Sequence, residues 1–273
     1  MIPLLQEIFS YGFLARAILV GALVALCAAL LGVSLVLKRY SMIGDGLSHV
    51  GFGALSVAMA MNAAPLAVAI PVVVVAAFLL LRLSENSRLM ADSAIALISS
   101  GALAAGVLVT SLSSGLNADV YSYMFGSILS MSQGDVVLSL GLALVVLTLF
   151  ILFYNKIFAI TFDESFARAT GAHARLYNML IALLTALTIV IGMRIMGTML
   201  ISGLIIFPAL TAMRLCRSFR AVVICAATVS VVCFFLGMVL SYGLATPAGA
   251  SVVMVNVGAY ILFWLLGRLL HRS

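Results

Sequence analysis

The sequence predicts an all-α integral membrane protein that crosses the bilayer about nine times. Three observations predict this class: the overall hydrophobicity, the spacing of long apolar stretches and the placement of the basic residues. Of the 273 residues, 65% are hydrophobic and only 8% are charged, and the mean hydropathy is +1.32. A soluble globular chain is typically about 45–50% apolar and about 25% charged. Because this chain cannot cover itself with a polar surface, we expect lipid to surround most of it.

Nine apolar stretches are candidate transmembrane helices, because a bilayer core about 30 Å thick requires roughly 17–25 apolar residues per helix. The second stretch is the shortest, so the count is about nine. The stretches are Phe13–Leu37, Leu47–Met61, Pro65–Leu83, Ser93–Leu112, Val136–Tyr154, Leu176–Gly192, Thr198–Met213, Ala221–Leu244 and Ser251–Leu270.

The basic residues support both the count and an orientation. Twelve of the 14 Lys and Arg residues follow odd-numbered stretches, and Arg16 and Arg194 are the exceptions. The long segment 113–133 after the fourth stretch carries no basic residue. Because cytoplasmic loops carry an excess of Lys and Arg, we predict the N-terminus outside and the C-terminus in the cytoplasm.

Composition and missing motifs exclude several classes of function. The net charge of +6 reflects membrane topology, since the sequence lacks the basic, aromatic-rich surface of a nucleic-acid-binding protein. None of the four cysteines has CxxC spacing, so neither a disulfide framework nor a zinc motif is predicted. The sequence contains no G-x-x-x-x-G-K-[ST] phosphate-binding loop and no H-E-x-x-H motif. We therefore expect no enzyme activity and no permanently bound cofactor.

Asp45 and His49 are the strongest candidates for a functional site, because they open the second stretch and do not lie in a loop. Four residues apart on a helix, their side chains share one face. An ionisable residue within a membrane span is costly and is a functional candidate by default. A carboxylate and an imidazole together suit a divalent transition metal, and zinc, manganese and iron are all allowed by ligand type. The alternative is an Asp–His hydrogen bond that joins two helices.

The surroundings of this pair favour a transport path. Gly44, Gly46, Gly51 and Gly53 are typical of the interrupted helices at which transporters expose backbone to a substrate. Two ligands do not complete a metal site, since zinc usually takes about four and manganese about six. Backbone carbonyls and water, or a second copy of the chain related by a two-fold axis, are expected to supply the remainder.

The cytoplasmic segment 155–175 contains TFDESFARATG, which predicts a short helix over about residues 161–171. Thr161 and Glu164 match the S/T-x-x-E capping box. Glu164 and Arg168 have the spacing of an i,i+4 ion pair. Gly171 supplies a C-terminal stop.

One face of this helix carries Phe162, Phe166 and Ala169. A short amphipathic helix of this kind lies on the membrane surface or docks into a groove of a partner protein. A membrane-surface helix would carry more Lys and Arg on its polar face. We therefore favour a protein partner.

Several segments of the chain resemble the metal-type ABC permeases, the membrane subunits of bacterial zinc, manganese and iron uptake systems. The first segment is the most specific, because it contains the family's G-D-x-L-S-H element. The segments are VLKRYSMIGDGLSHVGFGAL, ADSAIALISSGALAAG, YSYMFGSIL, FDESFARATG and GTMLISGLIIFPALTA. The resemblance covers nearly the whole chain. One departure is LATPAGASV before the last stretch, where relatives usually carry an acidic residue.

The resemblance implies a type II ABC importer-like permease in the bacterial cytoplasmic (inner) membrane, with residues 1–273 as a single transmembrane domain. It implies a homodimer or paired permease, two cytoplasmic ATP-binding subunits and an extracytoplasmic metal-binding solute-binding protein. Asp45 and His49 would line the metal path. The residues that would couple the permease to the ATPase are Phe162, Asp163, Glu164, Phe166, Arg168 and Gly171.

Two other classes of function remain open on the sequence alone. A secondary transporter would need no ATPase and could use Asp45 and His49 as a proton relay. A structural membrane subunit would have no path of its own, and Asp45→Ala would then reduce stability without affecting transport. The sequence shows no convincing inverted repeat, so we favour the ABC permease.

Overall fold

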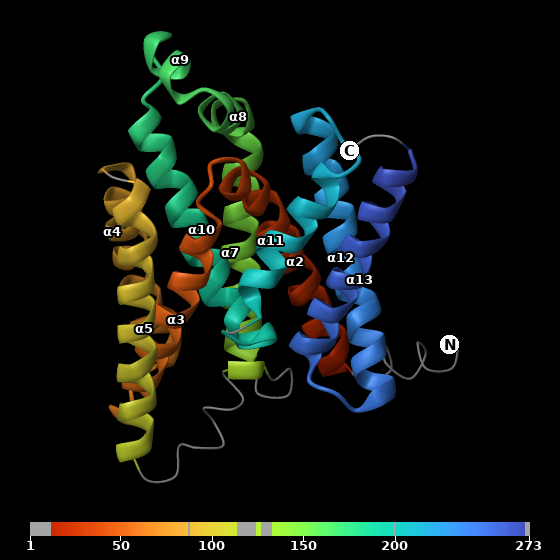
Figure 1. The fold of residues 1–273 in the computed structure, drawn as a ribbon. Coiled ribbons are helices and arrows are strands. Elements are labelled where there is room, and N and C mark those ends of the chain that lie inside the picture. The colour runs from red at the N-terminus through yellow and green to blue at the C-terminus, as the bar shows by residue number, and fades with distance from the viewer. Residues whose placement is uncertain (1–11, 87, 114–123, 127–132, 199, 271–273) are drawn as a thin grey trace.

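A computed structural model describes residues 12–86, 88–113, 124–126, 133–198 and 200–270, and every regular element in these ranges is a helix. Figure 1 shows the helices packed into one bundle. The elements are α2 (Gly12–Leu37), α3 (Ser41–Ala60), α4 (Pro65–Asn86), α5 (Arg88–Leu112), α7 (Gln133–Leu152), α8 (Tyr154–Phe162), α9 (Glu164–Ala169), α10 (Ala174–Met196), α11 (Ile201–Met213), α12 (Phe219–Leu244) and α13 (Ala248–Leu269). The all-α prediction is confirmed, and each predicted stretch falls on its own helix.

The long helices run up and down the bundle in alternation (Figure 1). Helices α2, α4, α11 and α13 all end at the top of the view, which is the end of the bundle that also carries the short helices α8 and α9. Helix α5 ends and helix α7 begins at the opposite end, where no basic residue was found in the connecting sequence. The basic helix ends are therefore gathered at one end of the bundle, as an alternating series of crossings requires.

Seven helices in the described part of the chain are long and apolar enough to cross a membrane. Helices α3 and α11 are not among them, so the predicted number of nine is approximate. Helix α11 has only 13 residues. Helix α3 has 20 residues but is made less apolar by its serines, its glycines and the Asp45–His49 pair.

The polar helix α3 is protected from lipid by its neighbours. It packs against α4, α5, α10 and α11. Most of its residues are buried, among them Leu47, Phe52 and Leu55. Because protein covers α3 on several sides, the helix does not need the apolar surface that lipid contact would demand.

Helix α3 begins at Ser41, six residues before the apolar stretch that starts at Leu47, and Asp45 and His49 both lie on it, as their spacing predicted. The expected interruption of this helix was wrong, because α3 is continuous and its glycines serve close packing. A Cβ at Gly53 would lie 2.7 Å from the carbonyl oxygen of Ala102 on α5. Small residues at such crossings let two helices approach closely.

Candidate functional site

Asp45 and His49 lie one turn apart on α3, and their side chains meet. The Nε2 atom of His49 is 3.7 Å from the Oδ2 atom of Asp45. The Asp45 side chain is 38% exposed and that of His49 is 15% exposed. The shared face that their spacing predicts is therefore present, and it is partly accessible in the single chain.

A third residue, Ser202, contacts this pair from another helix. Its hydroxyl on α11 donates a hydrogen bond to Oδ1 of Asp45 at 3.0 Å. Ser202 lies 157 residues after Asp45 in the chain. Sequence analysis missed it because a serine in an apolar stretch carries no local signal of its neighbours.

The His49 imidazole keeps unused bonding capacity. Its Nδ1 atom is buried and has no hydrogen-bond partner in the protein. The neighbouring Ser48 hydroxyl is not available to it, because that hydroxyl donates to the backbone carbonyl of Asp45 at 2.7 Å. A buried polar atom without a partner is costly, and such atoms in native structures call for an explanation. A ligand-binding site is one explanation that fits an acid–imidazole pair.

One chain alone does not assemble a full metal site. In the part of the chain that the structure describes, no group of three or more His, Cys, Asp or Glu side chains is close enough to hold a metal ion. If Asp45 and His49 bind a metal ion, they would supply two of the roughly four to six ligands that zinc or manganese takes. That other groups complete the coordination shell stays a prediction.

The predicted helix over residues 161–171 is two helices joined at Asp163, so the single-helix expectation was wrong. Asp163 has an extended backbone, with φ −145° and ψ 94°, that separates α8 from α9. Its carboxylate accepts a hydrogen bond from the backbone N–H of Phe166 at 2.9 Å and so caps α9. The predicted capping box is also wrong, because Thr161 lies inside α8 and donates to the Ile157 carbonyl at 2.6 Å. Asp163 is an equally favourable N-cap residue and lies nearer the actual bend.

The end of α9 follows the sequence prediction. Gly171 has a positive φ of 84°, a conformation that glycine adopts without strain. Its N–H bonds to the carbonyl of Arg168 at 3.1 Å, and the N–H of Ala172 bonds to that of Ala167 at 2.9 Å. These two bonds form the Schellman motif, which satisfies the last carbonyls of a helix.

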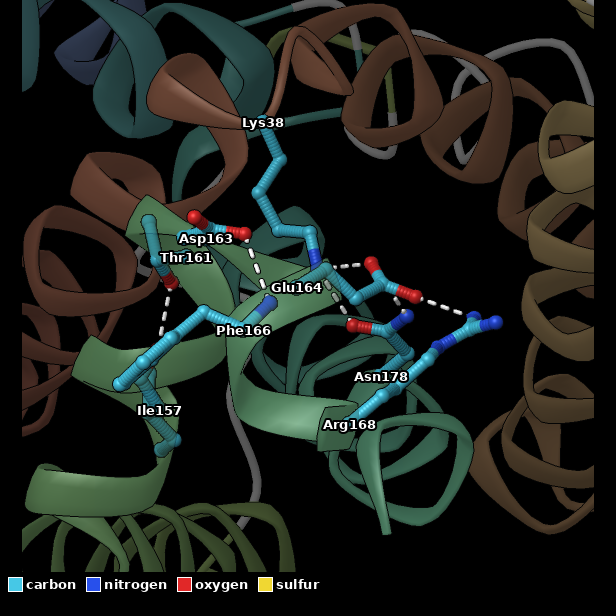
Figure 2. Close-up of polar contacts among 8 residues, drawn as sticks. All are labelled: Lys38, Ile157, Thr161, Asp163, Glu164, Phe166, Arg168 and Asn178. Atoms are coloured by element: carbon cyan, nitrogen blue, oxygen red, sulfur yellow. Dashed lines mark hydrogen bonds and ion pairs between the residues drawn. The ribbon is translucent and has the colours of Figure 1, made fainter. Parts of the chain in front are cut away.

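Glu164 is the centre of a polar cluster that joins three helices (Figure 2). Its Oε2 atom lies 3.2 Å from Nζ of Lys38 and accepts a hydrogen bond from the Asn178 side-chain amide, also at 3.2 Å. Its Oε1 atom pairs with Arg168 at 2.5 Å, which confirms the predicted i,i+4 pair. Lys38 also donates to Oδ1 of Asn178 at 2.5 Å. The cluster therefore links the end of α2, the start of α9 and the first turns of α10.

The electrostatics of this cluster favour an ionised Glu164. Partial burial acts to raise the pKa of the carboxyl group. The hydrogen bond from Asn178, the positive charge of Lys38 and the bonds from Lys38 and Arg168 outweigh that effect. The pKa of Glu164 is consequently held below its ordinary value of 4.5.

The aromatic residues of this region divide into a packed set and an exposed set. The rings of Phe158 and Phe219 lie 5.1 Å apart, so α8 packs against the start of α12. Phe162 lies at the edge of this contact, 6.0 Å from Phe219, and is 61% exposed. Phe166 on α9 is 66% exposed. Phe162 and Phe166 thus present apolar surface beside the polar cluster, at the end of the bundle where α9 lies.

Comparison with known proteins places the chain in one family. The model of the ABC 3 transport family matches residues 10–267, so the chain belongs to that family. The family is one of transport proteins, which agrees with the absence of catalytic motifs in the sequence.

The chain is similar to named metal-transport proteins over nearly all of its length. It is 29% identical to the manganese transport system membrane protein MntC of Halalkalibacterium halodurans, covering 92% of this chain and 86% of that protein. It is 28% identical to the high-affinity zinc uptake system membrane protein ZnuB of Haemophilus influenzae, covering 92% and 97%. Its fold matches PsaBC from Streptococcus pneumoniae, solved in complex with Fab, with a TM-score of 0.86 and 26% identity over 97% and 95% of the two chains.

Proposed function

We propose that this chain is the membrane-spanning permease subunit of an ATP-binding cassette importer for a divalent transition metal. Membership of the ABC 3 transport family supports the transport function. Its relatives include both a manganese and a zinc transport protein, which supports a divalent metal as the cargo. Zinc, manganese and iron all remain compatible with the residues.

The observation that carries this proposal is the Asp45–His49 pair on helix α3, most of whose residues are buried among the neighbouring helices. A carboxylate and an imidazole at 3.7 Å offer one hard oxygen ligand and one nitrogen ligand to a passing cation. Ionisable residues placed inside a membrane bundle mark ion paths in transporters. Asp45 and His49 would bind the metal in transit and then release it. Because one chain offers only these two ligands, transient binding is favoured over a permanent site.

The remaining ligands are proposed to come from a second copy of the chain. A two-fold axis near α3 would bring two Asp45 and two His49 side chains to one metal ion. A tandem fusion of two permease copies tests this, with Asp45→Ala and His49→Ala introduced in one copy only. Loss of nearly all metal binding is expected, whereas half of the wild-type stoichiometry would contradict a shared site.

Cytoplasmic ATP-binding subunits would dock on the end of the bundle that carries α8 and α9. The exposed rings of Phe162 and Phe166 supply the apolar contact, and Arg168 supplies an exposed charge. Asp163 and Gly171 fix the two ends of α9 and so define its shape. This assignment places that end of the bundle, and with it the C-terminus, in the cytoplasm of a bacterial cell and the N-terminus outside, in agreement with the basic residues. The opposite end would receive metal from an extracytoplasmic solute-binding protein.

The test is metal uptake by proteoliposomes that contain the chain with its candidate ATPase and binding protein. Wild type, Asp45→Ala and His49→Ala are compared for zinc, manganese and iron, with and without ATP. ATP-dependent uptake of one metal, lost in both variants while the complex stays assembled, is expected. Uptake that does not depend on ATP would instead indicate a secondary carrier. Uptake unaffected by either substitution would remove the pair from the path.

A further inference from the structure

The polar cluster around Glu164 has a buried inner part and an accessible outer part. The side chain of Glu164 is 27% exposed and that of Arg168 is 60% exposed. The Lys38 side chain is only 7% exposed, and Asn178 is 2% exposed. Both Glu164 oxygens are already engaged, one by Lys38 and Asn178 and the other by Arg168. Lysine is almost never buried in proteins unless it is paired. Glu164 therefore holds parts of the permease together and offers little to an external partner.

Lys38 stands at the junction between this cluster and the helix that carries the proposed metal ligands. It follows the last residue of α2, and only Arg39 and Tyr40 separate it from Ser41, the first residue of α3. The link is therefore short in sequence, since Asp45 follows Lys38 by seven residues.

The turn between α2 and α3 is tightly held. The N–H of Tyr40 bonds to the Leu35 carbonyl at 2.7 Å, and the N–H of Arg39 bonds to that of Val36 at 3.0 Å. Arg39 has a φ of 63°, in the left-handed region that residues with side chains seldom adopt. Such a conformation persists where the surroundings fix it. A displacement of Lys38 would consequently move the start of α3 as well, because the short hydrogen-bonded turn between them has little conformational freedom.

We infer that Lys38, Glu164 and Asn178 form a mechanical link that transmits movement of helix α9 to helix α3. Lys38 and Asn178 are positioning residues in this scheme: they touch neither the metal nor the ATPase and act by fastening α9 to α2 and α10. When the ATPase moves α9, the ion pair carries the end of α2 along and with it the helix of Asp45 and His49. This inference rests on the proposed function.

The link predicts a loss of coupling and not a loss of metal binding. Lys38→Met and Glu164→Gln each break the ion pair, and we expect each to lower the amount of metal transported per ATP hydrolysed at least fivefold. Metal binding to the purified complex should stay at the wild-type level in both. The double variant should transport as much metal per ATP as the more impaired of the two single variants, because the effects of residues that act as one unit are not additive. If the cluster only stabilised the fold, the two substitutions would lower the thermal midpoint of the complex and leave the amount of metal transported per ATP unchanged.

The experiment measures metal uptake and ATP hydrolysis in the same proteoliposomes, with the full complex of permease, ATPase and binding protein. The matched control is Lys156→Met, the same substitution at the other lysine of the chain, which is exposed on α8. We expect this control to keep the wild-type ratio. An equal loss in Lys156→Met would overturn the inference, because any positive charge near the ATPase would then matter.

Assembly and the proposed function are checked in parallel. If Lys38→Met does not assemble, Glu164→Gln decides in its place, because it removes the other charge of the same ion pair and keeps the size of the side chain. A reduced transport ratio in that variant supports the link, and an unchanged ratio overturns it. Wild-type complex that shows no ATP-dependent uptake would refute the proposed function itself. If the wild type transports metal normally and both Lys38→Met and Glu164→Gln keep its ratio of metal transported to ATP hydrolysed, only the mechanical link would be refuted.

Discussion

Two acid–base pairs with the same i,i+4 spacing occur in this protein, and they differ in almost every other respect. Asp45 and His49 on α3 are 3.7 Å apart, and one imidazole nitrogen has no protein partner. Glu164 and Arg168 on α9 are 2.5 Å apart, and the remaining carboxylate oxygen is held by Lys38 and by an amide. The first pair is left with open bonding capacity, whereas the second is saturated. Spacing alone therefore does not separate a ligand site from a structural joint.

The difference arises from what each pair meets in three dimensions. Asp45 accepts a hydrogen bond from the neutral hydroxyl of Ser202 and lies beside the His49 imidazole, and no Lys or Arg among the described residues pairs with it. Glu164 receives a full positive charge from a buried lysine in addition to its own arginine. An uncompensated carboxylate inside a bundle is suited to attract a cation. A compensated one is suited to hold helices in place, although its net contribution to stability is small.

The largest expected effect is the loss of either member of the open pair. Asp45→Asn and His49→Ala should reduce uptake by more than the roughly 10–100-fold that is typical when a group behind a metal ligand is removed. The reason is that each variant deletes a proposed ligand itself. Metal uptake by the reconstituted complex measures this, and size-exclusion chromatography of the same preparations controls for assembly. Uptake within about twofold of wild type would show that α3 does not line the path.

The next effect concerns Ser202, which orients the Asp45 carboxylate through one hydrogen bond. Ser202→Ala should weaken the apparent affinity for the transported metal by about tenfold, the lower part of the range for groups that support a ligand. Ser202→Thr keeps the hydroxyl and should retain most of the affinity. The two variants are compared by uptake as a function of metal concentration. Equal behaviour of the alanine and threonine variants would contradict an orienting hydrogen bond.

A smaller effect is expected from pH at the saturated pair. Because the pKa of Glu164 is held below 4.5, the cluster contributes to stability above that pH. As the pH falls through the folded-state pKa, the carboxylate becomes protonated and the contribution is lost. The thermal midpoint of wild type should therefore exceed that of Glu164→Gln by a constant amount down to about pH 5 and by less at lower pH. A margin that already shrinks near neutral pH would indicate that another group is responsible.

The smallest effect is expected from Arg168, the counterpart of His49 in the saturated pair. Its side chain is 60% exposed, so water screens its interaction with Glu164. Arg168→Ala should lower the free energy of unfolding by only about 0.2–0.5 kcal/mol, as for other i,i+4 pairs on a helix surface. Chemical denaturation of the detergent-solubilised protein measures this. A loss several times larger would mean that Arg168 is essential to the cluster and that Lys38 does not compensate Glu164 alone.

Local sequence patterns predicted most of the helices and the pairing of Asp45 with His49, but not the contact of Ser202 with Asp45. Apolar stretches located every long helix in the described part of the chain, and the i,i+4 spacing of Asp45 and His49 placed them on one face. The apolar stretch starts six residues after the start of α3, because Ser41, the glycines and Asp45 interrupt the apolar residues of the first turns. Thr161 was mistaken for a cap because the sequence does not show that the chain bends two residues later, at Asp163.

The tertiary contacts of both pairs could not be predicted. Ser202 reaches Asp45 across 157 residues, and Lys38 reaches Glu164 across 126. Neither Ser202 nor Lys38 has a local pattern that marks its partner, since contact between distant helices depends on how the whole bundle packs. The segment 113–133 was expected to lie at the outer end, and most of it falls outside the described residues.

The most direct test of these contrasting roles is equilibrium binding of the transported metal to the purified complex, compared between Asp45→Asn and Glu164→Gln. Each substitution replaces one carboxylate of an i,i+4 pair by its neutral isostere. We predict that Asp45→Asn abolishes measurable metal binding and that Glu164→Gln leaves the affinity at the wild-type value. Equal affinities in the two variants, whether both retained or both lost, would contradict the assignment of one pair to the metal and the other to the scaffold.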